Sequence, residues 1–173
     1  MKRTIKIANG QGFWGDSVDA PYNLVKYGKI DYLTLDYLAE VTLSIMQRQK
    51  LKNPEKGYAT DFVELFERIA VDIANKNIKV ITNAGGVNPE ICREKLLKIA
   101  KKLNLNIKIA IIKGDDILRD MDSLISGGVD FSNMDDNSDF SSIKNKVYSA
   151  NAYIDSFSIA EALSTDANIV LAG

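Results

Sequence analysis

The stretch IKVITNAGGVNPEICREKLLKIAKKLNLNIKIAII, residues 78–112, joins two β-branched runs through a glycine turn and a long helical pattern. We predict strands at 78–82 and 107–112 with a helix between them. Asn88 is a good N-cap for that helix, and Pro89 suits its first turn because the missing N–H has no partner there. A strand, a helix and a second strand in this order are typical of a parallel sheet covered by helices.

The same alternation extends in both directions from this stretch. Strands are predicted also at 4–8, 31–35 and 168–172, and helices at about 17–27, 37–50, 60–76 and 157–164. The polar segment 127–145 is expected to be an insertion or a flexible loop. At 173 residues the chain suits one core. The sequence therefore predicts a single α/β domain over residues 1–173, a three-layer sandwich with a mainly parallel, Rossmann-like sheet flanked by helices.

Charge and composition exclude several classes of function. With 22 basic and 23 acidic residues the net charge is -1, so no broad attraction to nucleic acid or to an anionic membrane surface is expected. The absence of histidine removes Ser-His-Asp and Cys-His catalysis and histidine-ligated zinc. No apolar run approaches a membrane span, and the single cysteine, Cys92, lies in a helical pattern typical of a core position. We expect a soluble protein of the reducing cytoplasm.

Four polar or glycine-rich segments follow predicted strands, at 9–17, 36–40, 82–90 and 113–116. In an open parallel sheet such loops emerge together at the carboxyl edge, where ligands bind. Gly85 and Gly86 are expected to leave backbone N–H groups free for a carboxylate, phosphate or enolate oxygen. A tight strand-to-helix turn accounts for the two glycines equally well.

Side chains in these segments supply candidate catalytic and binding groups. The candidate acids or bases are Asp16, Asp36 and Glu40, since a carboxylate transfers protons when burial raises its pKa. The residues expected to bind or orient the substrate are Asn9, Gln11, Gly12, Trp14, Asn83, Gly85, Gly86 and Asn151. No metal site is assigned, because the calcium-like run that starts at Asp135 has Phe140 where such a loop requires glycine.

Gly10, Gly12 and Gly15 have the spacing of a dinucleotide-binding fingerprint and follow a predicted strand. Two residues argue against this interpretation. Trp14 places a large ring inside the loop, and Asp16 places a carboxylate where a pyrophosphate would approach the helix. A nucleotide-dependent oxidoreductase is therefore an alternative function rather than the favoured one.

Several blocks of the sequence resemble one protein family, in order and along almost the whole chain. They are NGQGFWGDS followed by DAP, DYLTLDYLAEVTLSIMQRQ, GYATDFVELF, KVITNAGGVNP, and YSANAYIDSFSIAEAL with ANIVLAG. Together they resemble the N-terminal part of the acyclic terpene utilisation protein AtuA family. In that family the position of Gly10 need not be glycine, so we interpret Gly10 as incidental.

The resemblance implies a role in the catabolism of citronellol- and geraniol-type acids as CoA thioesters, and it assigns no chemical step and no cofactor. It also implies that the chain is the N-terminal fragment of a longer protein. The favoured hypothesis is an enzyme, or an enzyme component, that acts on a carboxylate or acyl-CoA metabolite. The alternative from another class is a noncatalytic domain that binds an acyl-CoA carboxylase-like partner. A second copy of the chain is a further candidate partner.

Overall fold

The computed structural model describes residues 4–38 and 40–173. The described chain divides into two compact units. The first unit, here called the sheet unit, contains the residues up to Lys113 together with Asp155–Gly173. The second, here called the inserted unit, is Gly114–Ile154.

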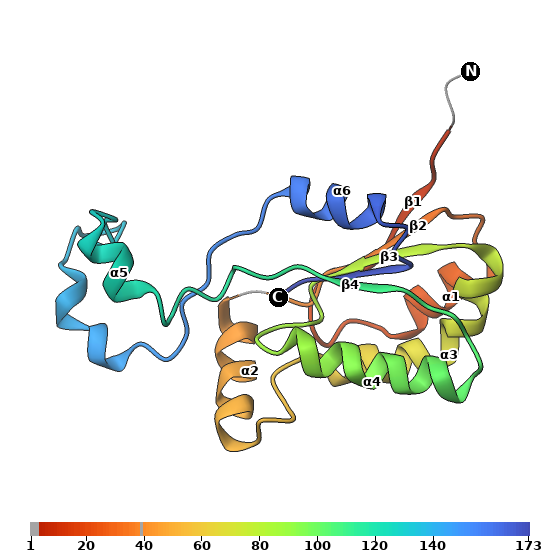
Figure 1. Cartoon of the computed structure of the whole chain (residues 1–173), viewed down its shortest axis with the longest axis horizontal. Helices are drawn as coiled ribbons and strands as arrows, with labels where there is room; N and C mark the ends of the chain where they lie inside the picture. Colours follow the sequence, from red (N-terminus) through yellow and green to blue (C-terminus); the bar gives the residue numbers. More distant parts are fainter. Residues whose placement is uncertain (1–3, 39) are drawn as a thin grey trace. The chain divides into compact units, whose positions relative to one another are not determined.

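The sheet unit contains five strands, and all of them are parallel, in agreement with the predicted sheet (Figure 1). They are β1 (Ile7–Gln11), β2 (Tyr32–Leu35), β3 (Lys79–Thr82), β4 (Ile109–Ile111) and β5 (Ile169–Leu171). Their order across the sheet is β1-β2-β3-β5-β4. The largest difference from the prediction is at β1, which was expected at 4–8. It continues to Gln11 because its pairing with β2 extends to that residue.

The helices of the sheet unit are α1 (Asp19–Tyr27), α2 (Glu40–Lys52), α3 (Thr60–Lys76), α4 (Pro89–Lys102) and α6 (Ser156–Ser164). The chain passes from β1 through β2 and β3 to β4 in one direction, and then returns to β5 in the other. Right-handed crossovers therefore place α1, α3 and α4 on one face of the sheet and α6 on the opposite face. Figure 1 shows this arrangement, which gives the predicted three layers.

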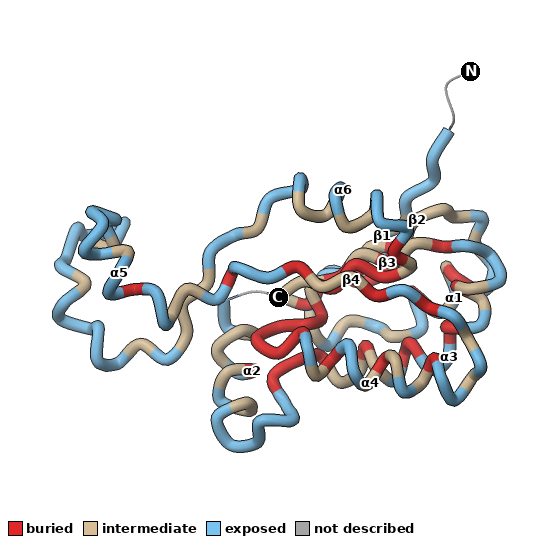
Figure 2. Tube along the Cα trace, in the orientation of Figure 1, coloured by how far each residue is buried: buried red, intermediate tan, exposed pale blue. Residues whose placement is uncertain are grey.

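The two faces of the sheet differ in burial. In Figure 2, α3 and α4 contain buried residues, whereas α6 on the other side of the sheet contains none. Leu33, Val80 and Ile169 pair across three strands and are fully buried beneath α1, α3 and α4. Thr34 and Ile81, one position further along β2 and β3, are only partly buried on the other face. We call these the helix-covered face and the open face. The predicted core position of Cys92 is confirmed, because this residue of α4 is completely buried.

Gly10, which we interpreted as incidental to a dinucleotide-binding fingerprint, has a packing role in the structure. The β1 register shifts between Asn9 and Gln11, which makes Gly10 the extra residue of a bulge. A Cβ at this position would lie 2.8 Å from Cβ of Pro21 in α1. Only glycine lets α1 approach the strand this closely.

The inserted unit begins earlier than the predicted segment 127–145 and contains a short helix that the sequence analysis missed. This helix is α5 (Met121–Ser126), and two 3-10 turns follow, η1 (Phe140–Ser142) and η2 (Lys144–Lys146). The two ends of the unit meet in an antiparallel bridge between Asp116 and Asn151. This bridge joins residues far apart in sequence, and no local pattern predicts it.

Candidate functional site

A pocket lies at the carboxyl edge of the sheet, on the open face. It has a volume of about 370 Å³ and is lined by Asn9, Thr34, Leu35, Asp36, Ile81, Thr82, Asn83, Ile159, Val170 and Ala172. These residues come from the ends of four strands, from the loops that follow them and from α6. Asn9, Asp36 and Asn83, which the sequence analysis nominated separately, thus line one pocket.

Asn83 connects the loops after β2 and β3 through both ends of its side-chain amide. Its nitrogen donates to Asp36 Oδ1 at 2.7 Å, and its oxygen accepts from the backbone N–H of Tyr37 at 2.7 Å. The backbone N–H of Leu38 also donates to Asp36 Oδ1, at 3.1 Å. Because both donors use Oδ1, the carboxylate is held in one orientation, and no hydrogen bond from the described residues reaches Oδ2.

Asn9 and Thr34 are opposite each other on β1 and β2. In the orientation that its neighbours require, the Asn9 amide nitrogen donates to the carbonyl oxygens of Gln11 and Thr34, both at 3.0 Å. The amide oxygen of Asn9 is then left as an acceptor. The Thr34 hydroxyl lies at the same wall of the pocket, where it accepts from the Asn9 amide nitrogen at 3.2 Å and donates to the Ala8 carbonyl at 3.4 Å.

The Gln11 and Trp14 side chains are directed away from this pocket, toward the helix-covered face. Gln11 is only 1% exposed, and its side-chain nitrogen donates to the Phe13 carbonyl at 3.3 Å. The Trp14 indole packs against the core and donates to Asp61 Oδ1 in the first turn of α3, at 2.9 Å. The structure thus separates two nominated residues from the group that lines the pocket.

Asp61 and Tyr37 lie with Gln11 and Trp14 on the helix-covered side of the sheet, and the sequence had not marked either of them as a site residue. Burial raises the pKa of Asp61, and its side-chain partner is the Trp14 indole N–H. The Tyr37 ring packs edge-on against Phe62, and burial raises the pKa of its hydroxyl. Within the described residues, the Tyr37 hydroxyl and the Gln11 side-chain oxygen have no hydrogen-bond partner. No sequence signal links Trp14 to Asp61, because they are 47 residues apart.

The Asp16 carboxylate closes the QGFWGD loop on itself. It accepts from the backbone N–H groups of Gly12 at 3.2 Å and Ser17 at 2.7 Å. A pyrophosphate in a dinucleotide-binding turn would need such N–H groups. The helix α1 also begins only at Asp19, beyond the glycine turn. The geometry therefore gives no support to the nucleotide-dependent alternative.

The glycine turn after β3 has no free N–H groups at its two glycines, contrary to our expectation. Gly85 donates to the Ala172 carbonyl at 3.0 Å, and Gly86 donates to the Asn83 carbonyl at 3.2 Å. A Cβ on Gly85 would lie 2.4 Å from the Ala172 oxygen, and Gly86 has a φ of 53°. The turn is therefore a packing element that fixes Asn83 at the pocket.

Residues 5–173 match the model of one protein family, described as acyclic terpene utilisation family protein AtuA. The chain belongs to the AtuA family. The resemblance that the sequence blocks indicated is thereby confirmed, and the family description suggests involvement in acyclic terpene utilisation. No curated protein and no solved structure matches the chain.

Two nominated residues of this AtuA-family chain are not among those that line the pocket. Glu40 begins α2 and is exposed. Asn151 belongs to the inserted unit, where its side chain donates to Asp115 Oδ2 at 2.9 Å. Asp115 is nearly buried, so this bond supports the bridge that closes the inserted unit.

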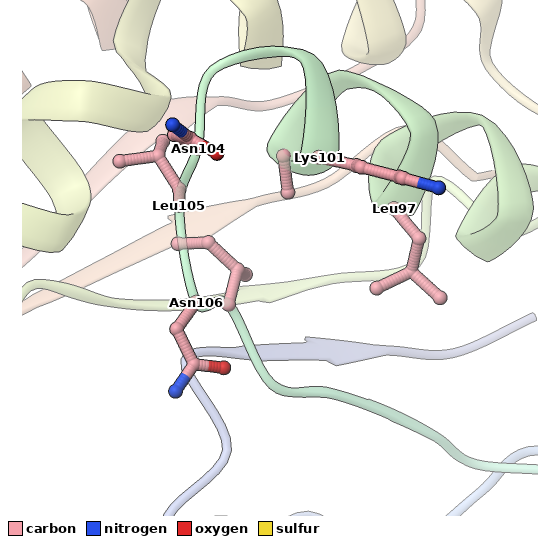
Figure 3. A pocket seen from close by; sticks show the side chains of 7 residues that line it. Leu97, Lys101, Asn104, Leu105 and Asn106 are labelled. Carbon is pink, nitrogen blue, oxygen red and sulfur yellow. The ribbon is translucent and has the colours of Figure 1, made fainter.

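A second hollow of the AtuA-family chain lies at the opposite end of α4 (Figure 3). It is lined by Leu97, Ala100, Lys101, Asn104, Leu105, Asn106 and Ile107. Asn104 has a φ of 57°, and the Leu105 N–H donates to the Ala100 carbonyl at 2.8 Å, so these residues end the helix. The hollow contains no carboxylate and no fixed polar pair, and we do not assign a site to it.

Across residues 4–38 and 40–173, no three or more Cys, Asp or Glu side chains gather as metal ligands. None of the helices in the described part of the chain combines the length and the apolar composition that a membrane crossing requires.

Proposed function

We propose that this chain is a cytoplasmic enzyme, or a component of an enzyme, of acyclic terpene or branched-chain acid catabolism. The proposed ligand is an acyl-CoA or the corresponding carboxylate, bound at the carboxyl-edge pocket. One observation supports this most: an oriented carboxylate, two side-chain amides and an apolar wall line the same pocket. A polar end and an aliphatic part of one ligand would both find partners there.

The charge of the lining favours the thioester over the free acid. No described lining residue is cationic, and Asp36 is anionic. A free carboxylate would be repelled at this position, whereas the carbonyl of a thioester carries no net charge. The phosphates of CoA would remain in solvent, outside the pocket. We therefore favour an acyl thioester as the ligand.

Asp36 is the proposed acid or base. Its free Oδ2 would take a proton from the carbon next to the thioester carbonyl and return it to the same carbon. The second N–H of the Asn83 amide would orient the carbonyl, whereas the Asn9 amide oxygen, an acceptor, would contact a donor group of the ligand. Gly85 and Gly86 use their N–H groups in the turn. Negative charge on the carbonyl oxygen would therefore be stabilised by the Thr34 hydroxyl, which would turn away from its 3.4 Å bond to the Ala8 carbonyl.

The remaining nominated residues have supporting roles in this proposal. Asp16 and Gly12 hold the QGFWGD loop closed, and Trp14 attaches that loop to α3. Gln11 supplies the carbonyl that accepts from the Asp36 backbone N–H at 3.0 Å. Glu40 is a second candidate acid or base, and Asn151 a candidate ligand contact of the inserted unit.

Proton exchange tests this proposal without knowledge of the complete reaction. The protein is incubated with octanoyl-CoA in D₂O, and deuterium at the carbon next to the carbonyl is followed by mass spectrometry. Wild type is expected to exchange above the buffer rate, and Asp36→Asn to lose about 100-fold or more of that rate with little change in affinity. Asp19→Asn, which changes an exposed carboxylate on α1, is the matched control. Equal rates for wild type and Asp36→Asn would contradict the role of Asp36.

A noncatalytic partner-binding domain is supported by a different observation. Ile5, Ile7 and Phe157 of the sheet unit are 53%, 68% and 81% exposed. Exposed apolar side chains mark an interaction surface where they form one contiguous patch. If this function is correct, a purified acyl-CoA carboxylase subunit will bind wild type and Asp36→Asn equally, and Ile7→Asp will weaken binding. If Ile7→Asp binds the carboxylase subunit as tightly as wild type does, this partner-binding function is contradicted.

A further inference from the structure

The helix α6 is packed more loosely than any other long helix of the sheet unit. It has no buried residue, although its sequence SFSIAEALS is mainly apolar or small. The helix α3, on the other face, buries six residues, Phe62, Leu65, Phe66, Ile69, Ala70 and Ile73. Helices with few buried contacts open locally at low free-energy cost. The layer formed by α6 is therefore the one best suited to move.

The two ends of α6 are attached differently. Just after its C-terminal end, Asp166 pairs with Lys79 at 3.1 Å and with Lys108 at 3.5 Å. Asn168 then accepts from the Lys108 backbone N–H at 2.8 Å. At the N-terminal end, the Asp155 carboxylate accepts only from the first turn of the same helix. In the described part of the chain, α6 is thus tied to the sheet near one end alone.

The pocket lies beneath the free part of this helix. Ile159, in the first half of α6, lines the pocket together with Ile81 and Val170 of the sheet. Asp166 has a φ of 62°, the left-handed conformation of a sharp turn, and it follows α6 directly. A rotation about this turn would lift Ile159 from the sheet without disturbing the strands.

We propose that α6 is a hinged cover that clamps the aliphatic chain of the ligand against the open face of the sheet, with Ile159, Ile81 and Val170 determining which chains fit. This proposal rests on the acyl-thioester function proposed above and names the part of the pocket that selects the substrate. The lining of this part is branched aliphatic and contains no aromatic ring. It suits flexible or branched aliphatic chains better than flat rings, which prefer aromatic partners.

A series of N-acetylcysteamine thioesters from butanoyl to decanoyl tests the selection step, because these probes carry no nucleotide. Affinity is measured by NMR titration. Each added methylene should tighten binding about fourfold until the space is filled, the ratio expected from about 0.8 kcal/mol per buried CH₂. Ile159→Trp, which fills the space, should weaken decanoyl binding at least tenfold. Phe157→Ala, also on α6 but 81% exposed, is the matched control and should bind as wild type does.

Hydrogen exchange tests the movement. Without ligand, the amides of α6 should exchange faster than those of α3, and the decanoyl probe should slow exchange in α6 more than the butanoyl probe. If the decanoyl probe binds but hydrogen exchange of the α6 amides does not change, the proposal that α6 covers the ligand is wrong.

The outcomes separate this proposal from the function on which it rests. If the probes bind with no dependence on chain length, and Ile159→Trp binds as wild type does, the aliphatic site is wrong while the thioester function stands. If wild type binds none of the probes, the function and the cover both fail.

Discussion

The two faces of the sheet differ in how far their side chains are buried, and the candidate pocket lies on the less covered face. On the helix-covered face, Leu33 and Val80 are fully buried beneath α1, α3 and α4. On the open face, the neighbouring Thr34 and Ile81 are partly exposed and line a pocket. Parallel sheets are usually buried on both faces. The cover of this face is incomplete beside Thr34 and Ile81, which is where the candidate pocket lies.

The two faces also differ in the residues that they carry, those of the core on one face and those of the candidate site on the other. The helix-covered face carries the apolar contacts and the Trp14–Asp61 hydrogen bond. The open face carries Asp36, whose carboxylate is held by Asn83 at an exposed edge. Substitutions on the first face should change the free energy of unfolding, and substitutions on the second should change ligand binding. The predictions below test that division, beginning with the largest effect.

Gly86→Val is expected to be the most destabilising change. Gly86 has a φ of 53°, and a Cβ there would lie 2.3 Å from Met46 Sδ and 2.8 Å from the Gly57 oxygen. Backbone strain and overpacking together should lower the free energy of unfolding by about 3–5 kcal/mol, measured by urea denaturation. Gly12→Ala is the control, because the nearest atom to its added Cβ would be 3.9 Å away. Similar midpoints for the two variants would contradict this account of the turn.

Leu33→Ala and Thr34→Ala compare the two faces at adjacent positions of β2. Leu33 is completely buried, so its truncation should cost about 3 kcal/mol through lost burial and the remaining cavity. Thr34 is partly exposed, and its truncation should cost less than about 1 kcal/mol. Both values come from chemical denaturation at neutral pH. An equal loss at the two positions would mean that the open face contributes to stability as much as the covered face.

The sequence predicted the strands and most helices because their patterns are local. The helix over 60–76 has its expected bounds, since its apolar side repeats at helical spacing and Asn77, with a φ of 54°, ends it. The carboxyl-edge location of the candidate site likewise follows from the order of strands and loops. Where a strand contains a bulge, the local sequence does not predict toward which face of the sheet a side chain points. Asn9 and Gln11 are two residues apart, and the bulge at Gly10 helps to set their directions.

Hydrogen bonds between distant loops were also beyond the sequence analysis. Gly85 and Gly86 were expected to offer free N–H groups, because nothing local shows that Ala172 and Asn83 accept from them. The Asn88 side chain, expected to cap α4, instead donates to the carbonyl groups of Pro54 and Lys56. In each case the N–H group donates to a carbonyl oxygen of another residue, and not to the partner that the local sequence predicted.

Trp14→Phe tests how firmly the QGFWGD loop is attached to the helix-covered face. The change keeps a ring but removes the 2.9 Å bond to Asp61, leaving a half-buried carboxylate with one donor fewer. A loss of about 1–2 kcal/mol in unfolding free energy is expected. A double-mutant cycle with Asp61→Asn isolates the pair, and a coupling energy near zero would show that the bond contributes nothing.

The smallest expected effect is on the pH dependence of the unfolding free energy, to which Asp61 and Asp166 contribute with opposite signs. Burial raises the pKa of Asp61 above its ordinary value of 3.8, so the folded state binds this proton more tightly than the unfolded chain. The stability that Asp61 contributes is therefore complete below pH 3.8 and is lost as pH rises through the folded pKa. Lys79 and Lys108 lower the pKa of Asp166 below 3.8, so its contribution is present above that value and is lost as pH falls.

Fluorescence makes the Asp61 titration observable, because Trp14 is the single tryptophan of the chain and donates to that carboxylate. The emission of folded wild type should change with a midpoint above pH 3.8, and Asp61→Asn should remove the step. Asp166→Asn should leave the step in place, since it changes a carboxylate paired with Lys79 and Lys108 instead. The stability of Asp61→Asn relative to wild type should rise through the same pH interval, which unfolding at several pH values measures. A step that persists in Asp61→Asn would assign the titration to another group and remove the evidence that the covered face carries this buried carboxyl.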